Sequence, residues 1–152
     1  MKSIVIFFAL SFLYLNGFAQ ADNPKYDKAL ADSLGGDDYG MKSYILVILK
    51  TGTNRTAKKE TADSLFKGHI ANIIRLASLG KLIVAGPIKK NDKSYRGIFI
   101  LNVSTIEEAN ALLTSDPAIK EQLLEAELFQ WYGSAALPEY LKVHEKIEKK
   151  KM

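Results

Sequence analysis

Residues 64–87 read SLFKGHIANIIRLASLGKLIVAGP, and this stretch decides the fold. Apolar residues recur in its first half at the three- and four-residue spacing of a helix that covers a sheet. Gly80 ends this helix, and residues 81–85 continue as a short apolar strand. His69 lies on or beside the apolar face, so its titratable ring needs a partner. The apolar residues of that face are Leu65, Ile70, Ile73, Leu76, Ala77 and Leu79.

The composition favours one small globular domain with added terminal segments. The chain has 152 residues, of which 47% are hydrophobic and 25% are charged, enough to bury a core. It has no cysteine, which excludes disulfides, thiolate nucleophiles and thiolate metal ligands. The formal net charge is +4, and basic residues are interspersed with acidic ones. Nucleic acid is therefore not an expected partner.

Residues 1–19 have the pattern of a cleavable signal peptide. Lys2 gives a positive start, residues 4–15 form an apolar core, and Gly17 and Ala19 supply the small residues that precede a cleavage site. A membrane anchor is the weaker interpretation, because the apolar run is shorter than the roughly 20 residues that span a bilayer. We expect cleavage after Ala19, a periplasmic or secreted protein, and no membrane association afterwards.

The segments that flank the expected domain are polar. Residues 20–41 form a leader that ends in a run rich in glycine and aspartate, which favours turns. Two alternatives stay open for this leader, namely two helical turns docked on the domain or a mobile segment. The domain is expected at residues 42–136. Residues 137–152 are expected to form a charged helix with a lysine tail, in which Leu141 and Ile147 face the domain.

The domain is predicted to follow the order β-α-β-β-α-β. The predicted strands are residues 44–49, 81–85, 96–103 and 124–132, and the predicted helices lie within residues 64–79 and 104–113. Ser104, with Glu107 three residues later, predicts a capping box at the start of the second helix. Pro117 suits the first position of a short helical turn. This order is that of an α+β, ferredoxin-like fold with two right-handed crossovers.

A second copy of the chain is expected to cover the sheet. The two helices can cover one face of a four-stranded antiparallel sheet, but residues 44–49 and 98–101 show no polar alternation. The second face must therefore be buried as well. The same face of another copy, related by a two-fold axis, is the simplest cover. We predict a homodimer, a dimeric α+β barrel in which two sheets stack around a shared interior.

Five motifs in this order resemble the YciI-like (YCII-related) family of dimeric α+β barrels. They are His69 followed by the strand GKLIVAGP, then Arg96-Gly97, Glu107-Glu108-Ala109, Asp116-Pro117-Ala118 and Trp131-Tyr132-Gly133. The resemblance covers residues 42–133 and implies a barrel dimer whose pocket holds a His and an Asp as an active-site pair. By motif these are His69 and Asp116. Members with an assigned reaction include a dehydrochlorinase of a chlorinated hydroxyquinol. Many members carry Arg three positions before the His, where this chain has Phe66.

His69 and Asp116 can act as a chemical pair. In the expected topology both approach one end of the sheet. A carboxylate that accepts one imidazole N–H fixes the tautomer and raises the basicity of the second nitrogen, which can then move a proton near neutral pH. Two plainer interpretations stay open. His69 can be a core residue bonded to a backbone carbonyl, and Asp116 can be the N-cap of the turn at Pro117.

Four further residues are candidates for substrate binding. Gly86 and Pro87 either end a strand or let a ligand approach the backbone closely. Arg96 either attracts an anionic substrate or is simply solvated. Trp131 either packs in the core or interface, or forms a platform at the barrel rim. The spacing of the two histidines predicts no metal site, and no glycine-rich loop predicts a phosphate site, so no cofactor is expected.

Two functions of different class fit these features. The first is an exported, cofactor-independent enzyme of lyase or isomerase type, with His69 as general acid and base and Asp116 as its orienter on a small molecule. The second is a non-catalytic dimer that binds a small apolar ligand in the barrel, where His69 only forms a hydrogen bond. The fold does not decide between them, because function depends on the site.

Overall fold

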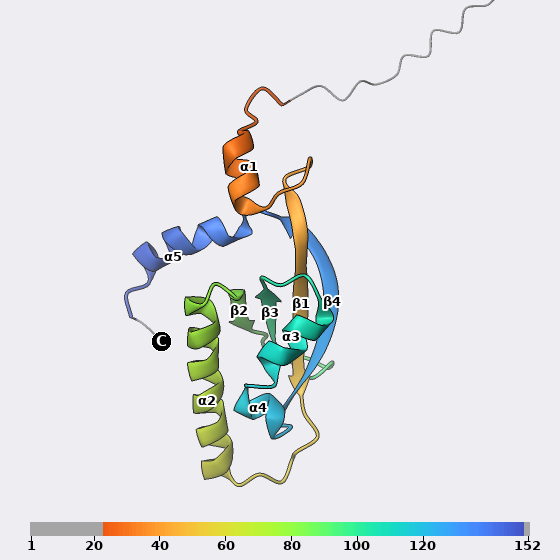
Figure 1. Cartoon of the computed structure of the whole chain (residues 1–152). Helices are drawn as coiled ribbons and strands as arrows, with labels where there is room; N and C mark the ends of the chain where they lie inside the picture. The colour runs from red at the N-terminus through yellow and green to blue at the C-terminus, as the bar shows by residue number, and fades with distance from the viewer. Residues whose placement is uncertain (1–22, 151–152) are drawn as a thin grey trace, which may run out of the picture.

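The computed structural model describes residues 23–150, so the predicted signal peptide at residues 1–19 lies outside the described residues. Figure 1 shows the order of the elements along the chain. They are α1 (Lys28–Leu34), β1 (Met41–Thr51), α2 (Lys59–Ser78), β2 (Leu82–Pro87), β3 (Tyr95–Leu101), α3 (Ile106–Leu113), α4 (Pro117–Lys120), β4 (Leu124–Ser134), the 3₁₀ helix η1 (Leu137–Tyr140) and α5 (Leu141–Ile147).

The four strands form one antiparallel sheet in the order β2-β3-β1-β4. β1 is central, and it pairs with β4 along its whole length, from Met41 opposite Ser134 to Thr51 opposite Leu124. Helix α2 connects β1 to β2, and α3 and α4 connect β3 to β4. This is the ferredoxin-like arrangement, so the predicted α+β fold class is confirmed. β1 and β4 are longer than predicted, and β3 ends two residues earlier, at Leu101.

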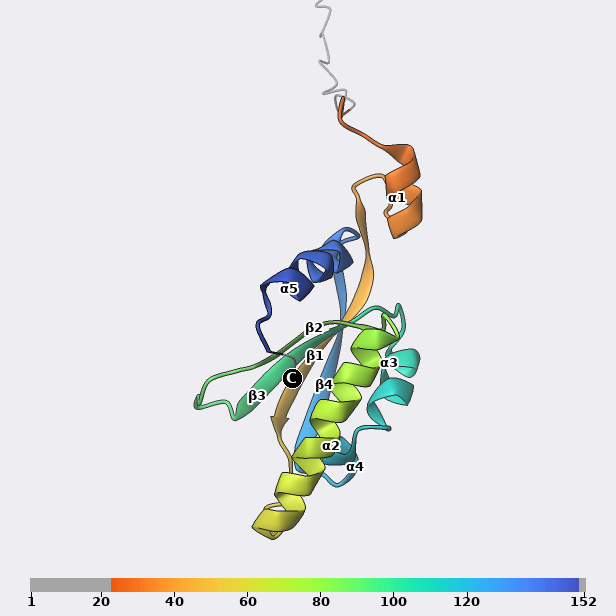
Figure 2. The same ribbon diagram turned by 90° about the vertical axis from the view of Figure 1, so that its left-hand side faces the viewer.

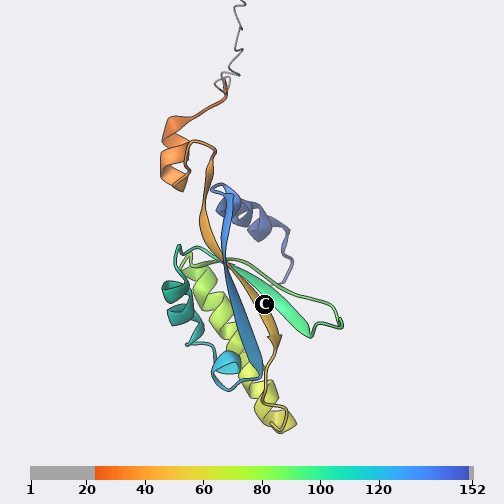
Figure 3. The ribbon, with the colours of Figure 1, turned by 90° about the vertical axis from the view of Figure 1, so that its right-hand side faces the viewer.

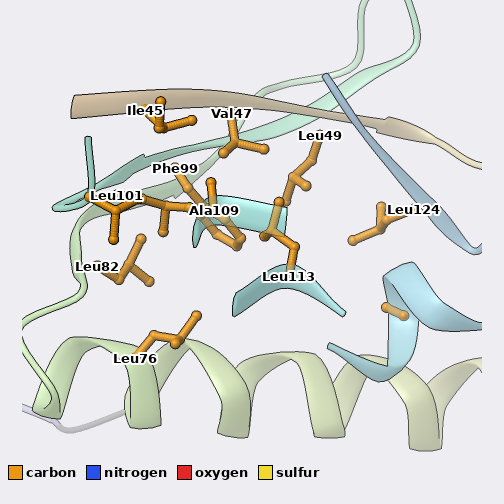
Figure 4. Packing of buried hydrophobic residues seen from close by; sticks show 12 residues of the cluster. Ile45, Val47, Leu49, Leu76, Leu82, Phe99, Leu101, Ala109, Leu113 and Leu124 are labelled. Atoms are coloured by element: carbon orange, nitrogen blue, oxygen red, sulfur yellow. The ribbon is translucent and has the colours of Figure 1, made fainter. Parts of the chain in front are cut away.

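Helices α2, α3 and α4 all lie on one side of the sheet (Figures 2 and 3). The strand residues that point toward them pack with helix residues into one core (Figure 4). Fully burying a Leu, Val, Ile or Phe side chain stabilises the fold by about 1.5–3 kcal/mol each. The core consists of Ile45, Val47, Leu49, Leu76, Leu82, Phe99, Leu101, Val103, Ala109, Leu113, Ala118 and Leu124.

The opposite face of the sheet carries the alternate strand residues, which are apolar in the middle of the sheet and charged toward one end, where Lys50 pairs with Glu127. Leu46, Ile48 and Ile98 are half-buried there, and Phe129 is 47% exposed. Within residues 23–150, only η1 and α5 lie on this side, near one end of the strands (Figures 2 and 3). Tyr140 of η1 holds this segment by donating a hydrogen bond to the carbonyl of Ile83. The second face is therefore apolar in part, and the homodimer stays a prediction.

The buried side of α2 differs from the predicted stripe. The residues of α2 that are buried or packed against the core are Phe66, His69, Asn72, Ile73 and Leu76. Ile70 is instead 39% exposed, and Leu79 is 59% exposed. Both sets follow helical spacing, so periodicity alone does not choose between them. The structure buries the set that includes two polar residues, His69 and Asn72, because both find a hydrogen-bonding partner across the core.

One predicted helix start is wrong by one residue, and another is confirmed. Thr105, not Ser104, is the N-cap of α3, and its hydroxyl accepts a hydrogen bond from the amide of Glu108 at 3.2 Å. Both hydroxyl residues precede a Glu by three positions, so the capping-box pattern fits either register. Asp116 caps α4 and Pro117 takes its first position, as the sequence predicts.

The terminal segments are shorter and more exposed than the domain. Helix α1 has two turns and no buried residue. The Lys42 ammonium donates to the carbonyl of Leu34 at 3.2 Å, and the Tyr132 hydroxyl donates to the Asp37 carboxylate, so α1 is tied to the sheet at its C-terminal end. Helix α5 ends at Ile147, which is 73% exposed, so the prediction that Ile147 faces the domain is wrong within one copy.

Candidate functional site

A pocket of about 330 Å³ lies between α2 and the sheet. It is lined by Leu49, Phe66, His69, Ile70, Ile73, Ala85, Gly86, Pro87, Arg96, Gly97, Phe99 and Leu124. His69 and Arg96 are the two residues of this lining with ionisable side chains. At this wall β3 approaches β2 closely, because a Cβ at Gly97 would lie only 2.9 Å from the carbonyl oxygen of Gly86. A larger groove, about 690 Å³, lies between α3, α4 and β4, but His69 does not line it.

His69 and Asp116 form a direct pair at this pocket. His69 Nδ1 lies 2.7 Å from Asp116 Oδ2, although the two residues are 47 positions apart. The carboxylate is fully buried, with 0% of the residue exposed, and the histidine side chain is 10% exposed. The imidazole stacks on Phe99 with ring centroids 5.8 Å apart, and Phe66 meets its edge at 6.3 Å. Two aromatic rings and one carboxylate thus fix the orientation of the histidine.

Asp116 serves as both a helix cap and a histidine partner, using one oxygen for each role. Its Oδ1 accepts the backbone amides of Ala118 at 3.0 Å and Ile119 at 3.3 Å, which is the N-cap of α4. Its Oδ2 accepts His69 Nδ1 and, at 3.2 Å, the side-chain amide of Asn72. The two interpretations that the sequence left open for Asp116 are therefore both compatible with one conformation.

The Asp116 carboxyl is stabilised as an anion. Burial alone raises its pKa, but the hydrogen bonds and positive charge of His69 oppose that effect, together with the hydrogen bonds from Asn72 and Ile119. The result is a pKa below the ordinary value of an aspartate. An ionised carboxylate can only accept, so the proton of the His69–Asp116 hydrogen bond belongs to Nδ1 of the histidine.

The second ring nitrogen of His69, Nε2, is available to a ligand. It has no hydrogen-bonding partner among residues 23–150. Every fully buried side-chain nitrogen or oxygen in that range does have a partner, so Nε2 is not fully buried. Nε2 therefore keeps contact with solvent, and His69 meets solvent where it lines the pocket. With the proton on Nδ1, this nitrogen carries the free lone pair of the neutral ring. The arrangement can accept a proton from a molecule bound in the pocket and return it.

The other predicted site residues divide into two groups. Gly86, Pro87 and Arg96 line the pocket together with His69. Trp131 does not join them. It lies opposite Tyr44 on the face of the sheet that points away from α2, where its ring packs beside Tyr44 at 5.7 Å. Side chains alternate along a strand, so Trp131 cannot reach the His69 pocket of its own chain.

Two residues that matter to the geometry were not predicted from the sequence. Asn72 is 6% exposed and bonds Asp116 from the next turn of α2. Gly68 allows α2 to approach α4, because a Cβ at this position would lie 2.6 Å from Cγ of Pro117. Two signals in the sequence could have identified them, namely a glycine inside a helix and a polar residue three positions after a buried histidine.

The part of the chain that the structure describes holds no group of three histidine, aspartate or glutamate side chains close enough to bind a metal ion. The donor pair at His69 and Asp116 therefore stands without a third ligand among these residues. Within the same range, no helix combines the length and hydropathy that crossing a membrane requires.

Comparison with known proteins gives distant structural likenesses only. No protein-family model matches this sequence, and no curated protein matches it. A similar solved structure is the 5-chloro-2-hydroxyhydroquinone dehydrochlorinase from Burkholderia phenoliruptrix AC1100 in complex with 2,5-dihydroxybenzoquinone. It is 20% identical, with a TM-score of 0.42, and the match covers 57% of this chain and 92% of that one. A likeness this distant carries no argument about activity, so membership of the YciI-like family remains a prediction from the motifs.

Proposed function

We propose that this chain is an exported, cofactor-independent enzyme of lyase or isomerase type that acts on a small molecule. The observation that carries this proposal is the 2.7 Å contact between His69 Nδ1 and the buried carboxylate of Asp116, at a histidine that lines a pocket. Export rests on the pattern of residues 1–19 alone. A histidine oriented by a carboxylate is the usual arrangement for general acid/base work.

The proposed reaction begins with proton abstraction by His69. Nε2 takes a proton from an acidic C–H or O–H group of the bound molecule, and the ring becomes an imidazolium that the Asp116 carboxylate stabilises. The electron pair left on the substrate forms a new double bond. In a lyase, the electrons then expel a leaving group, which receives the proton from Nε2. In an isomerase, Nε2 returns the proton to a different atom.

The lining of the pocket indicates the size and polarity of the substrate. About 330 Å³ is at the small end of ligand pockets, and the walls other than His69 and Arg96 are apolar or glycine. A small, largely apolar molecule fits this lining. Arg96 is an exposed residue at the edge of this lining, and we expect its positive charge to favour an anionic group on such a molecule. Gly86 and Pro87 contribute backbone to the same wall.

We also propose that two copies assemble into the dimeric barrel. The support is the second face of the sheet, where Leu46, Ile48 and Ile98 form an apolar strip that the described chain leaves half-exposed. Sheets with both faces apolar are normally covered on both sides. In such a dimer, Trp131 belongs to the interface, and the His69 pocket remains on the helix side of each sheet.

A hydrogen-exchange experiment tests the catalytic proposal without knowledge of the substrate. The protein is incubated in D₂O with a panel of small apolar carbon acids, and loss of each acidic C–H signal is followed by NMR. We expect at least one compound to exchange faster with the wild-type protein, and His69→Gln to slow that exchange by about 100-fold or more. An exchange rate that is equal in both proteins for every compound would overturn the proposal.

The alternative is a non-catalytic protein that binds a small apolar ligand. The nearly uniform apolar lining of the pocket favours it. In this case a compound from the same panel binds, as seen by shifts of the Phe66 and Phe99 ring signals, but does not exchange. His69→Gln would then change the dissociation constant only a few-fold, because one neutral hydrogen bond contributes about 0.5–1.5 kcal/mol.

A further inference from the structure

Three polar residues of α2 lie on one line that leads from the pocket to solvent. His69, Asn72 and Arg75 follow each other at steps of three, so they share one side of the helix. His69 and Asn72 are buried, at 8% and 6% exposed, and Arg75 is exposed. Each contacts the short connection between α3 and α4, which contains Ser115 and Asp116.

The hydrogen bonds along this line are continuous. Asn72 Nδ2 donates to Asp116 Oδ2 at 3.2 Å, and Asn72 Oδ1 accepts from Arg75 Nη2 at 2.7 Å. The same Nη2 lies 2.7 Å from Ser115 Oγ. The Ser115 hydroxyl has one proton, and its shortest acceptor is the carbonyl of Leu112 at 2.7 Å, so Oγ accepts from Arg75.

Arg75 determines which way the Asn72 amide faces. A guanidinium can only donate, so the amide atom next to it must be the oxygen. The amide nitrogen is then the atom that faces Asp116. In the flipped orientation the amide oxygen would meet a carboxylate oxygen and the amide N–H would meet a guanidinium N–H, and both contacts are repulsive.

The Asn72 amide completes the set of donors around the carboxylate. Asp116 Oδ2 accepts from His69 and Asn72, and Oδ1 accepts from the amides of Ala118 and Ile119. Each oxygen therefore has two donors, and the carboxylate is held in one orientation. Without Asn72, one lone pair of a fully buried anion would be left without a donor, which favours protonation or rotation of the carboxyl group.

We propose that Asn72 is a positioning residue that holds the Asp116 carboxylate for His69, and that Arg75 fixes the orientation of the Asn72 amide. Neither residue lines the pocket, so neither is a catalytic residue. The inference rests on the proposed function for its kinetic consequence. Its structural consequence, a single His69 tautomer with the proton on Nδ1, is measurable without any substrate.

Asn72→Leu tests the first half of this proposal. Leu has the branched shape and the four side-chain heavy atoms of Asn, and it cannot donate to Asp116. The readouts are the ¹⁵N ring signals of His69, which report the tautomer, and the ¹³C carboxyl signal of Asp116 during an acid titration. We expect a mixed His69 tautomer, a higher titration midpoint for Asp116, and exchange slowed by about 10- to 100-fold. A folded Asn72→Leu protein with an unchanged tautomer and an unchanged midpoint would overturn the proposal.

Arg75 variants test the second half and keep the proposal falsifiable if Asn72→Leu does not fold. The double variant Arg75→Met/Ser115→Ala removes both groups that can donate to Asn72 Oδ1, because Ser115 Oγ lies 3.2 Å from that atom. We expect this double variant to show the same tautomer mixture as Asn72→Leu. The single variant Arg75→Lys should keep the single tautomer of the wild type. Lys67→Met is the control, since it removes an exposed cation of α2 away from this line. A single tautomer in the double variant would overturn the role of Arg75.

The failure of this inference is distinguishable from failure of the proposed function. If no compound exchanges with the wild-type protein, the function fails, but the tautomer measurements still decide the role of Asn72. If exchange depends on His69 while Asn72→Leu exchanges at the wild-type rate with the wild-type tautomer, the positioning role fails and the function stands.

Discussion

Gly68 of α2 and Pro117 of α4 lie in contact, with no room for a side chain between them. A Cβ at position 68 would lie 2.6 Å from Pro117 Cγ, well inside van der Waals contact. The residues next to this contact are His69 and Asp116, whose side chains meet at 2.7 Å. Close approach of the two helices therefore positions the pair, and the glycine makes that approach possible.

Gly68→Ala is the first prediction that follows from this contact. Ala has the higher helix propensity, by about 1 kcal/mol, so an isolated helix would gain stability. Here the added methyl group must displace the half-buried ring of Pro117, and overpacking costs about 1–3 kcal/mol. We expect a net loss in the free energy of unfolding, measured with urea, and loss of the single His69 tautomer seen by ¹⁵N NMR.

Ser64→Ala and Lys67→Ala are the controls for this prediction, because both positions are exposed on the same helix. They should leave the tautomer unchanged and keep stability within about 0.5 kcal/mol of the wild type. A Gly68→Ala protein that is more stable than the wild type and keeps its tautomer would show that α2 and α4 can separate without cost to the pair.

The second prediction concerns stability in acid. The pKa of Asp116 is lower in the folded chain than in the unfolded chain, because His69, Asn72 and Ile119 together outweigh the effect of burial. The stability that this gives is fully present above the unfolded value of about 3.9, and it is lost as the pH falls toward the folded value. Unfolding free energies measured from pH 7 to pH 3 should therefore decrease in the acid range.

Asp116→Asn isolates this contribution. At pH 7 the variant should be less stable by about 1–3 kcal/mol, because a buried donor or acceptor loses its partner. The difference between the two proteins should shrink below pH 4, because the Asp116 carboxyl of the unfolded wild-type chain takes up a proton there while the folded one stays ionised. A difference that stays constant from pH 7 to pH 3 would contradict the lowered pKa of Asp116.

The sequence was sufficient to predict the sheet, and the resemblance of its motifs to a family pointed to His69 and Asp116, but neither predicted the side of α2 that is buried. The apolar runs in β1 to β4 and the turns between them fix the order of the elements, and the order brings His69 and Asp116 to one end of the sheet. The rotation of α2 depends on Asp116, which accepts hydrogen bonds from two polar residues of that helix. The apolar stripe predicted from the sequence therefore includes Ile70 and Leu79 and omits Asn72.

Trp131 illustrates the same limit on a strand. Both sets of alternate residues in β4 contain large apolar side chains, with Leu124 and Leu128 in one set and Phe129 and Trp131 in the other. Alternation within β4 therefore does not reveal which set faces the helices. The register with β1 decides it, because Trp131 lies opposite Tyr44 and not beside the core residue Ile45. That register depends on pairing across the sheet and is not encoded in either strand alone.

The third prediction tests how α1 is attached to the sheet. The hydrogen bond to the Asp37 carboxylate raises the pKa of Tyr132 to about 12, because ionising the phenol would place two negative charges together. The stabilising effect is present below pH 10, the ordinary value for tyrosine, and is lost as the pH rises through about 12. Tyr132→Phe should therefore remove one late transition from the phenolate absorbance titration.

Asp37→Asn should move that same transition down toward pH 10, while Asp38→Asn, which removes an adjacent exposed charge, should leave it in place. If Asp37→Asn titrates like the wild type, as Asp38→Asn should, then the segment between α1 and β1 does not hold Tyr132 in solution.

The fourth prediction concerns assembly through the second face of the sheet. Ile98 lies in β3 between Ile48 and Gly86, on the face that points away from α2, and it is half-buried. A charge there would be buried in a sheet-to-sheet dimer, at a cost of several kcal/mol. In a monomer, the same charge would remain near water. Ile98→Glu should therefore convert a dimer to a folded monomer in sedimentation velocity experiments, with unchanged far-UV circular dichroism.

Ile74→Glu provides the matched control, because Ile74 is 46% exposed on the outer side of α2. It introduces the same charge away from the proposed interface and should leave the protein dimeric. The experiment must begin with the wild-type chain at micromolar concentration, where an interface of two apolar sheet faces should hold the copies together. A wild-type protein that sediments as a monomer at that concentration would mean that the apolar strip around Ile98 has another cover.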